Sequence, residues 1–207
     1  MRVLLPITYF GSLDYFVLIA RSDEVWIEAC ESYPKQTLRN RCKILGANGL
    51  MDLTIPIAHQ ENRLISQFQS DEATNWRNQH WQALLSAYKS SPFFQYIEAD
   101  LEQFYQQNHQ PLFQLLYENT QQWCKWLGIK TPIHLTTDFE VAPADKLDFR
   151  DKFKPSKYPS LFSYEEYYQV FSDKHGFQSN LSILDLFCNE GRQALSYLMQ
   201  VPAGGRF

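Results

Sequence analysis

The segment TLRNRCKI places three cations, Arg39, Arg41 and Lys43, at alternating positions. Alternate side chains of a β-strand share a face, so a strand here would present all three cations together. Such a face could clamp a phosphate or a carboxylate, because each guanidinium offers a bidentate fork. The alternative is an exposed sheet face whose cations pair with Glu28 or Glu31 of a neighbouring strand.

The turn from Pro6 to Asp14 is a second candidate site, because it connects an apolar strand-like run to a helix-like segment. Ligands of open α/β sheets commonly bind at such strand-to-helix turns. Tyr9 and Ser12 could supply hydroxyl groups there. The turn lacks a glycine-rich dinucleotide or phosphate-loop pattern, and a plain helix cap at Ser12 is the alternative.

The segment WRNQHW contains Trp76 and His80, which lie one turn apart on a helix. A histidine in this position could act as a general base. The alternative is a partly buried histidine that only forms hydrogen bonds.

The segment HGFQSNLSILDLFCNEG (175–191) combines polar residues with side chains apolar enough to be buried. Its Ser182-Ile-Leu-Asp185 has the form of a helix capping box. Asn189-Glu190-Gly191 predicts a break before a final helix, because glycine relieves the backbone there. Local structure therefore accounts for Ser182, Asp185 and Gly191 without a ligand.

Two residues of this segment, His175 and Asn189, are not explained by capping. Asn180 suits the turn before the helix. A buried Asp185 would need a partner, because an unpaired buried carboxylate is costly, and Arg41 is a conceivable one.

Periodicity predicts the elements that must position these residues. The first strand, the first helix and the second strand form a β-α-β unit. The next two segments, in which apolar and polar residues alternate, form a hairpin around a Gly-Ala-Asn-Gly turn at 46–49. The predicted elements of this part are strands at 2–7, 24–30, 37–45, 50–57 and 64–69, and a helix at 13–20.

The rest of the chain is predicted to be mainly helical, with amphipathic helices between 72 and 128 and closing helices at 164–171 and about 183–199. A strand is expected at 133–139, and a long functional loop at 142–163. The prediction is a single α/β domain over 1–207: a mixed sheet that starts parallel in 1–70, a helical middle and C-terminal part, and a frayed tail.

Composition narrows the class of protein. The chain has 207 residues, 44% of them hydrophobic and 15% aromatic, which excludes a disordered chain. A net charge of −4 disfavours general nucleic-acid binding. The four cysteines have neither CxxC spacing nor a histidine at metal-ligand spacing, so buried thiols and no metal are predicted. With no signal peptide or membrane span evident, a cytoplasmic protein is expected.

Over nearly its whole length the sequence resembles the WbqC-like proteins. The matching features are the Pro6–Phe16 turn, Tyr33 and Lys35 ahead of Asn40-Arg41, LTIPI, Trp76 with His80, YKSSPFF, YYQVF and the 175–191 segment. The order and spacing of these features carry the resemblance. Many members have a His-Gln-Pro triplet near the start, where this chain has Leu4-Leu5-Pro6.

The resemblance implies a role in O-antigen-type surface-polysaccharide biosynthesis, where transfer of an amino acid onto a sugar has been suggested for some members. The enzyme hypothesis is therefore acyl or aminoacyl transfer to a sugar nucleotide or glycan precursor. His80 or His175 would act as the base, and Asp185 would orient one of the reacting groups. The sequence does not specify a cofactor. The predicted substrate-binding residues are Tyr9, Lys35, Arg39, Asn40, Arg41, Asn180 and Asn189.

The rival hypothesis is a non-catalytic accessory protein that binds a sugar or a partner enzyme of the same pathway. It rests on the lack of a recognised catalytic triad, metal set or nucleotide loop in the sequence. Aromatic side chains such as Trp26 and Phe93 could line a sugar-binding groove.

Overall fold

The computed structural model describes residues 1–59, 64–106, 111–153 and 160–202. The predicted C-terminal tail and part of the predicted 142–163 loop lie outside these residues. None of the helices in the described ranges is both long and apolar enough to cross a membrane.

The chain begins with the β-α-β unit that its apolar pattern predicts. Strand β1 (Arg2–Pro6) buries every side chain after Arg2, as expected for a strand covered on both faces. Helix α1 (Leu13–Arg21) leads to β2 (Glu24–Glu28), which runs parallel to β1 with Leu4 opposite Trp26. The α/β class is therefore confirmed.

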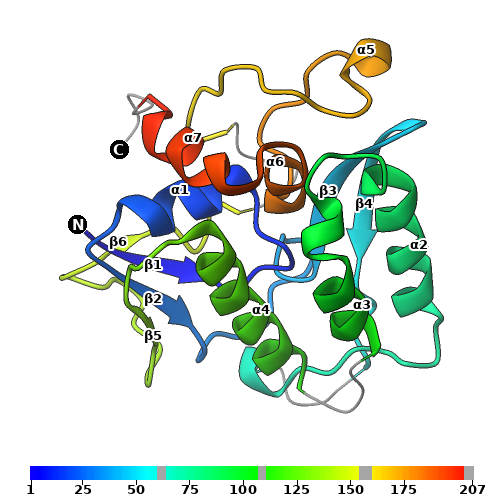
Figure 1. Cartoon of the computed structure of the whole chain (residues 1–207). Coiled ribbons are helices and arrows are strands. Elements are labelled where there is room, and N and C mark those ends of the chain that lie inside the picture. Colours follow the sequence, from blue (N-terminus) through cyan, green and yellow to red (C-terminus); the bar gives the residue numbers. More distant parts are fainter. Residues whose placement is uncertain (60–63, 107–110, 154–159, 203–207) are drawn as a thin grey trace.

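Two further strands complete a parallel sheet in the order β5-β2-β1-β6 (Figure 1). They are short: β5 covers Ile133–Leu135 and β6 covers Leu147–Asp148. Each comes from a segment far along the chain and pairs parallel with an N-terminal strand. The predicted strand at 133–139 thus ends at Leu135.

The parallel and antiparallel strand pairs belong to two separate sheets. Strands β3 (Arg41–Gly46) and β4 (Gly49–Thr54) form a separate antiparallel hairpin. The predicted turn at 46–49 is confirmed, with Gly46 opposite Gly49 and a φ of 106° at Gly49 that favours glycine.

The helices form two groups (Figure 1). One group is α1 with α6 (Ile183–Glu190) and α7 (Ala194–Gln200), which pack together beside the parallel sheet. In the other group, α2 (Trp76–Tyr88) and α3 (Glu98–Gln106) pack together next to β3. Both groups share one aromatic-rich core. The remaining elements are α4 (Leu112–Leu127), α5 (Ser172–His175) and the 3-10 turns η1 (Ile65–Gln67), η2 (Phe94–Tyr96) and η3 (Gly191–Gln193).

Two predicted elements are wrong. The expected helix at 164–171 is irregular, and side chains 167–169 alternate between buried and exposed as in an extended chain. Tyr164 and Tyr167 donate hydrogen bonds to two buried carboxylates, which anchors this segment without helical bonds. The expected strand at 64–69 is instead the 3-10 turn η1 between two isolated bridges at Leu64 and Ser70.

Candidate functional site

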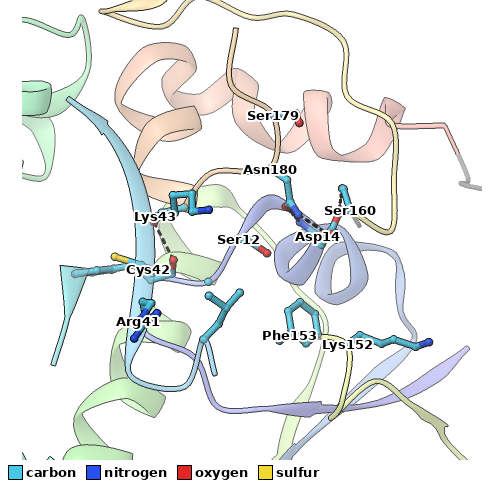
Figure 2. Close-up of a pocket in the computed structure, with 14 residues that line it drawn as sticks. Ser12, Asp14, Arg41, Cys42, Lys43, Lys152, Phe153, Ser160, Ser179 and Asn180 are labelled. Atoms are coloured by element: carbon cyan, nitrogen blue, oxygen red, sulfur yellow. Dashed lines mark hydrogen bonds between the residues drawn. The ribbon is translucent and has the colours of Figure 1, made fainter. Parts of the chain in front are cut away.

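A cavity of about 230 Å³ lies where the first strand-to-helix turn meets β3 and a C-terminal segment (Figure 2). Arg41 and Lys43 lie on its β3 side, and Lys152 with Phe153 lies across from them. Its polar lining therefore contains three cations together with hydroxyl, amide and carboxylate groups. The polar side chains that matter most here are Ser12, Asp14, Arg41, Lys43, Lys152 and Asn180.

The first turn of α1 is held by the segment that precedes α6. The Leu13 amide donates to the Leu181 carbonyl at 3.0 Å, and the Asp14 amide donates to Asn180 Oδ1 at 2.9 Å. The next two amides of the helix donate to the Ser12 carbonyl. The amides at this helix end are already used, so the cavity must recognise a ligand through side chains.

The turn also carries backbone strain. Phe10 has a φ of 41° and Asn180 a φ of 52°, a left-handed region that residues other than glycine seldom adopt. Both residues line the cavity. Non-glycine residues held in this conformation cluster at functional sites, which makes the observation consistent with a binding role.

Asp14 is a buried carboxylate that ties the cavity wall together. Its two oxygens accept hydrogen bonds from the Tyr164 hydroxyl at 2.7 Å, Ser160 Oγ and Asn180 Nδ2 at 2.8 Å, and the Leu161 amide at 2.9 Å. Burial raises the pKa of Asp14, and these hydrogen bonds oppose the rise. A carboxylate with four donors has little capacity left for a ligand.

Two polar groups of the cavity have no partner among the described residues. The Ser12 hydroxyl is buried and caps no amide, although Ser12 occupies the predicted N-cap position. The Arg41 Nε atom is also buried without an acceptor, and its Nη1 atom lies 4.0 Å from Asp52. Unsatisfied buried donors are costly, and the described residues supply an acceptor to neither of these two groups.

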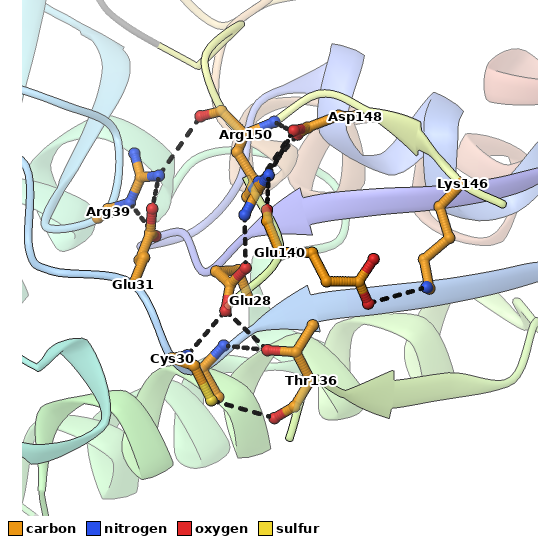
Figure 3. A network of polar contacts seen from close by, with 10 residues as sticks. Glu28, Cys30, Glu31, Arg39, Thr136, Glu140, Lys146, Asp148 and Arg150 are labelled. Atoms are coloured by element: carbon orange, nitrogen blue, oxygen red, sulfur yellow. Dashed lines mark hydrogen bonds and ion pairs between the residues drawn. The ribbon is translucent and has the colours of Figure 1, made fainter. Parts of the chain in front are cut away.

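The predicted cationic face is only partly correct. Arg41 and Lys43 share a face of β3 and line the cavity, as alternation requires. Arg39 precedes the strand, is buried, and pairs with Glu31 at 2.6 and 2.7 Å (Figure 3). For Arg39 the alternative reading, pairing with Glu31, is therefore the one observed.

Figure 3 shows that this pair belongs to a larger ionic network at the carboxyl ends of the parallel strands. Arg150 donates to Glu28 at 2.8 Å and to Asp148 at 2.6 Å, while Arg39 also donates to the Arg150 carbonyl. Burial raises the pKa of Glu31 despite the nearby Arg39 guanidinium. Open α/β sheets commonly bind ligands at this edge, but here side chains of the protein fill it.

Tyr9 and His80 meet in the core rather than at the cavity. The Tyr9 hydroxyl lies 3.0 Å from His80 Nδ1 and 2.5 Å from the Tyr105 hydroxyl. The predicted contact between Trp76 and His80 is present, with ring centroids 5.3 Å apart. Burial lowers the pKa of His80 to about 4, against a raising contribution from a backbone hydrogen bond with Thr54.

Asp185 does not pair with Arg41, so that expectation is wrong. The carboxylate accepts hydrogen bonds from Tyr167 at 2.7 Å and Gln169 at 2.8 Å. Ser182 does cap α6 by accepting from the Leu184 amide, but Asp185 turns to the 167–169 segment instead of completing a capping box. Burial raises the pKa of Asp185 to about 6.

The other predicted site residues are dispersed. Asn40 and Asn189 are buried and donate to the backbone carbonyls of Ile55 and Asp185, respectively, each at 2.7 Å. Lys35 is exposed in the segment before β3. His175 is half-buried against the β3–β4 turn, where its Nε2 atom lies 3.1 Å from the Ala47 carbonyl oxygen. Of the predicted substrate-binding residues, Arg41 and Asn180 line the cavity together.

Sequence reasoning missed Lys152 and Ser160 as cavity residues. Both fall within the 142–163 segment, whose charges and weak periodicity predicted a functional loop. That segment-level signal was present, but nothing in the local sequence indicates which of its side chains face β3. No group of three or more potential metal ligands occurs in the described ranges.

The fold and the cavity define a class: an α/β protein with a cationic, hydroxyl-rich pocket at its first strand-to-helix turn. The chain belongs to the WbqC-like protein family, whose model matches residues 8–160. It is 30% identical to the uncharacterized protein Rv1507c of Mycobacterium tuberculosis over 92% of this chain and 94% of that protein. No solved structure matches the chain.

The N-terminal departure from the family pattern has a clear structural setting. Leu4 and Leu5, the positions at which the resemblance implies His-Gln in many members, are buried in β1 and do not line the cavity. In this chain, that position contributes to the core.

Proposed function

We propose that the cavity binds the anionic part of a sugar nucleotide or a sugar-containing precursor, and that the protein transfers an acyl or aminoacyl group onto the sugar. One observation carries the proposal: Arg41 and Ser12 line one cavity, and each has a buried donor, Nε and the hydroxyl respectively, without a partner in the described part of the chain. A phosphate oxygen would supply the acceptors that both donors lack.

The charge of the cavity supports an anionic ligand. Arg41, Lys43 and Lys152 contribute three positive charges to the lining, against one lining carboxylate, Asp14, which accepts four hydrogen bonds from the protein. Attraction between opposite charges strengthens in a partly buried site, because the effective dielectric constant falls below that of water.

The sugar part of the proposal rests on family membership and on the remaining lining. WbqC-like proteins are associated with surface-polysaccharide biosynthesis, as the resemblance implies. The cavity is also lined by Ser179 and by Ser160, whose hydroxyl proton is donated to Asp14. Hydroxyl side chains can donate and accept hydrogen bonds, which suits the hydroxyl groups of a sugar.

Acyl transfer also requires a proton acceptor. The donor's carbonyl carbon forms a bond to a sugar nitrogen or oxygen, the bond to the donor's leaving group breaks, and the acceptor's proton passes to a base. None of the three proposed catalytic side chains is among the residues that line the cavity. Asp185, the residue expected to orient the reacting groups, is buried and accepts hydrogen bonds from Tyr167 and Gln169. It lies one helical turn beyond Ser182, which lines the cavity.

The second candidate function is binding without catalysis. The four hydrogen bonds accepted by Asp14 favour it, because they occupy the carboxylate that lines the cavity. His80 and His175 also lie elsewhere, one in the core and the other against Ala47. In this case the protein would present a sugar precursor to a partner enzyme.

The test is thermal unfolding with inorganic phosphate, nucleoside diphosphates and sugar nucleotides on wild-type protein and Arg41→Gln. A ligand at about 100 times its dissociation constant should stabilise the wild type by about 2.7 kcal/mol. Arg41→Gln should lose most of this stabilisation. Lys130→Gln removes one exposed cation outside the cavity and serves as the matched control.

The outcomes separate the candidates. A sugar-nucleotide shift that depends on Arg41, followed by transfer to a sugar in assays with acyl and aminoacyl donors, supports the transferase. The same shift without turnover supports the accessory role. Equal shifts in Arg41→Gln and wild type, or no shift with any anion, would overturn the binding proposal.

A further inference from the structure

A second, larger hollow of about 650 Å³ lies at the other end of α6 from the cationic cavity. Its floor is aromatic, with Phe93 and Tyr96 from the η2 region, Trp126 from α4 and Phe187 from α6. The volume falls within the range of roughly 300–1,000 Å³ that is usual for ligand sites. We call this hollow the aromatic groove.

The backbone at Gly191 packs tightly against the Phe93 ring in the groove. Gly191 has a φ of 56°, and a Cβ atom placed there would lie 2.5 Å from the Phe93 ring. The Phe93 amide donates to the Cys188 carbonyl at 2.9 Å, which fixes the backbone beneath the ring. Tyr96 lies beside Phe93, with ring centroids 6.1 Å apart, and is 70% exposed. Most of the Tyr96 side chain is therefore accessible to a ligand.

Trp126 also borders a neighbouring polar depression of about 200 Å³ between α3 and α4. That depression is lined by the carboxylates of Asp100 and Glu118 and by the amides of Gln103 and Gln122. One tryptophan therefore separates an aromatic surface from a group of hydrogen-bond donors and acceptors.

We propose that the aromatic groove and this depression together bind the neutral sugar rings of a glycan. A sugar ring has a face of C–H groups that packs on the electron-rich face of an aromatic ring, and hydroxyls at its edge that pair with carboxylates and amides. That this glycan is the acceptor of the transferred group rests on the proposed function.

Charge argues for a neutral ligand over an acyl carboxylate. The groove has two cations, Lys125 and Arg192, and one carboxylate, Glu190. The depression beyond Trp126 adds two carboxylates, so the two hollows together carry more negative than positive groups. An anionic amphiphile lying across Trp126 would meet net negative charge. Sugar hydroxyls can pair with groups of either sign.

The test is saturation-transfer-difference NMR with neutral oligosaccharides (maltohexaose, cellohexaose and chitohexaose) at millimolar concentration. Tyr96→Ala should weaken binding about five- to tenfold, the effect of losing one ring contact. Trp126→Ala should abolish binding. Tyr96 is highly exposed, so its variant keeps the test valid even if Trp126→Ala does not fold.

Tyr168→Ala is the matched control, because Tyr168 is also exposed, at 58%, and lies outside the groove. No saturation transfer, or transfer unchanged in Tyr96→Ala, overturns the inference. Decanoate binding that depends on Tyr96, without oligosaccharide binding, overturns it in favour of an acyl ligand.

Failure of this inference can be told apart from failure of the proposed function. Tyr96→Ala should retain the sugar-nucleotide thermal shift, and Arg41→Gln should retain oligosaccharide binding. If wild-type protein shows no thermal shift with any anion, the proposed function fails. A saturation-transfer signal from oligosaccharides that depends on Tyr96 would still support the groove.

Discussion

The Nδ1 atom of His80 lies 3.0 Å from the hydroxyl of Tyr9 inside the aromatic core. The two residues are 71 positions apart and connect α2 to the first strand-to-helix turn. Through this contact, His80 packs against the turn and helps to hold it in place. It also gives the stability of the protein a testable pH dependence.

The difference in stability between wild type and His80→Gln should shrink on acidification. Burial lowers the pKa of His80 from 6.5 to about 4 in the folded protein. The stability contributed by neutral His80 is therefore present above pH 6.5 and is lost as the pH falls towards 4. The change should be on the order of 3 kcal/mol, at about 1.4 kcal/mol per unit of pKa. Urea unfolding of both proteins across this range measures it, and a constant difference would contradict it.

Arg39→Met should destabilise the protein strongly, by about 3–5 kcal/mol, because it leaves Glu31 as an uncompensated buried charge. The double variant Arg39→Met/Glu31→Leu should recover most of this loss, since no unpaired charge remains. Chemical denaturation of the two singles and the double gives the coupling energy. Additive losses would show that the 2.6 Å contact is not a coupled pair.

Asp14→Asn should loosen the segment from Ser160 to Tyr164. The asparagine side chain keeps one acceptor oxygen, so several of the present hydrogen bonds are lost or weakened, at about 1–3 kcal/mol for the group. Hydrogen exchange at the Leu161 amide, which now donates to Asp14, should accelerate. Asp138→Asn, at an exposed aspartate, is the control and should leave that amide unchanged.

Gly191→Ala should cost about 1–3 kcal/mol, because the residue is in the left-handed region and the new Cβ would meet the Phe93 ring. Gly46→Ala is the matched comparison: its nearest neighbour would lie at 3.8 Å and its φ carries no such strain. Thermal unfolding of both variants measures the difference. Equal stability of the two would contradict the close contact between Gly191 and Phe93.

Patterns with local causes were predictable from the sequence. Alternation placed Arg41 and Lys43 on one face, and the hairpin turn and the N-cap at Ser182 follow from residue types at fixed spacings. The same rules failed where a distant partner decides the conformation. Tyr164 and Tyr167 lie in an extended segment because Asp14 and Asp185 accept their hydroxyls, and no local pattern encodes those partners.

In the candidate site, too, local patterns were predictable and contacts with distant residues were not. Asn180 was singled out from its turn-forming position, but its role depends on Asp14, 166 residues away. His80 was predicted as a base from residue type and a helical neighbour. The contact that places it in the core, Tyr9, comes from another part of the chain. Residue type suggests which chemistry is possible, whereas long-range packing determines which side chains reach the cavity.

The hydrogen bonds between the first helix and the Asn180–Ile183 segment have a consequence for biosynthesis. The Leu13 and Asp14 amides are paired only when Asn180 and Leu181 are in place. A chain emerging from the ribosome makes its first strand and helix early, yet it cannot complete the cationic cavity until the Asn180–Ile183 segment has been synthesised. Chains that lack this segment would therefore also lack one wall of the cationic cavity.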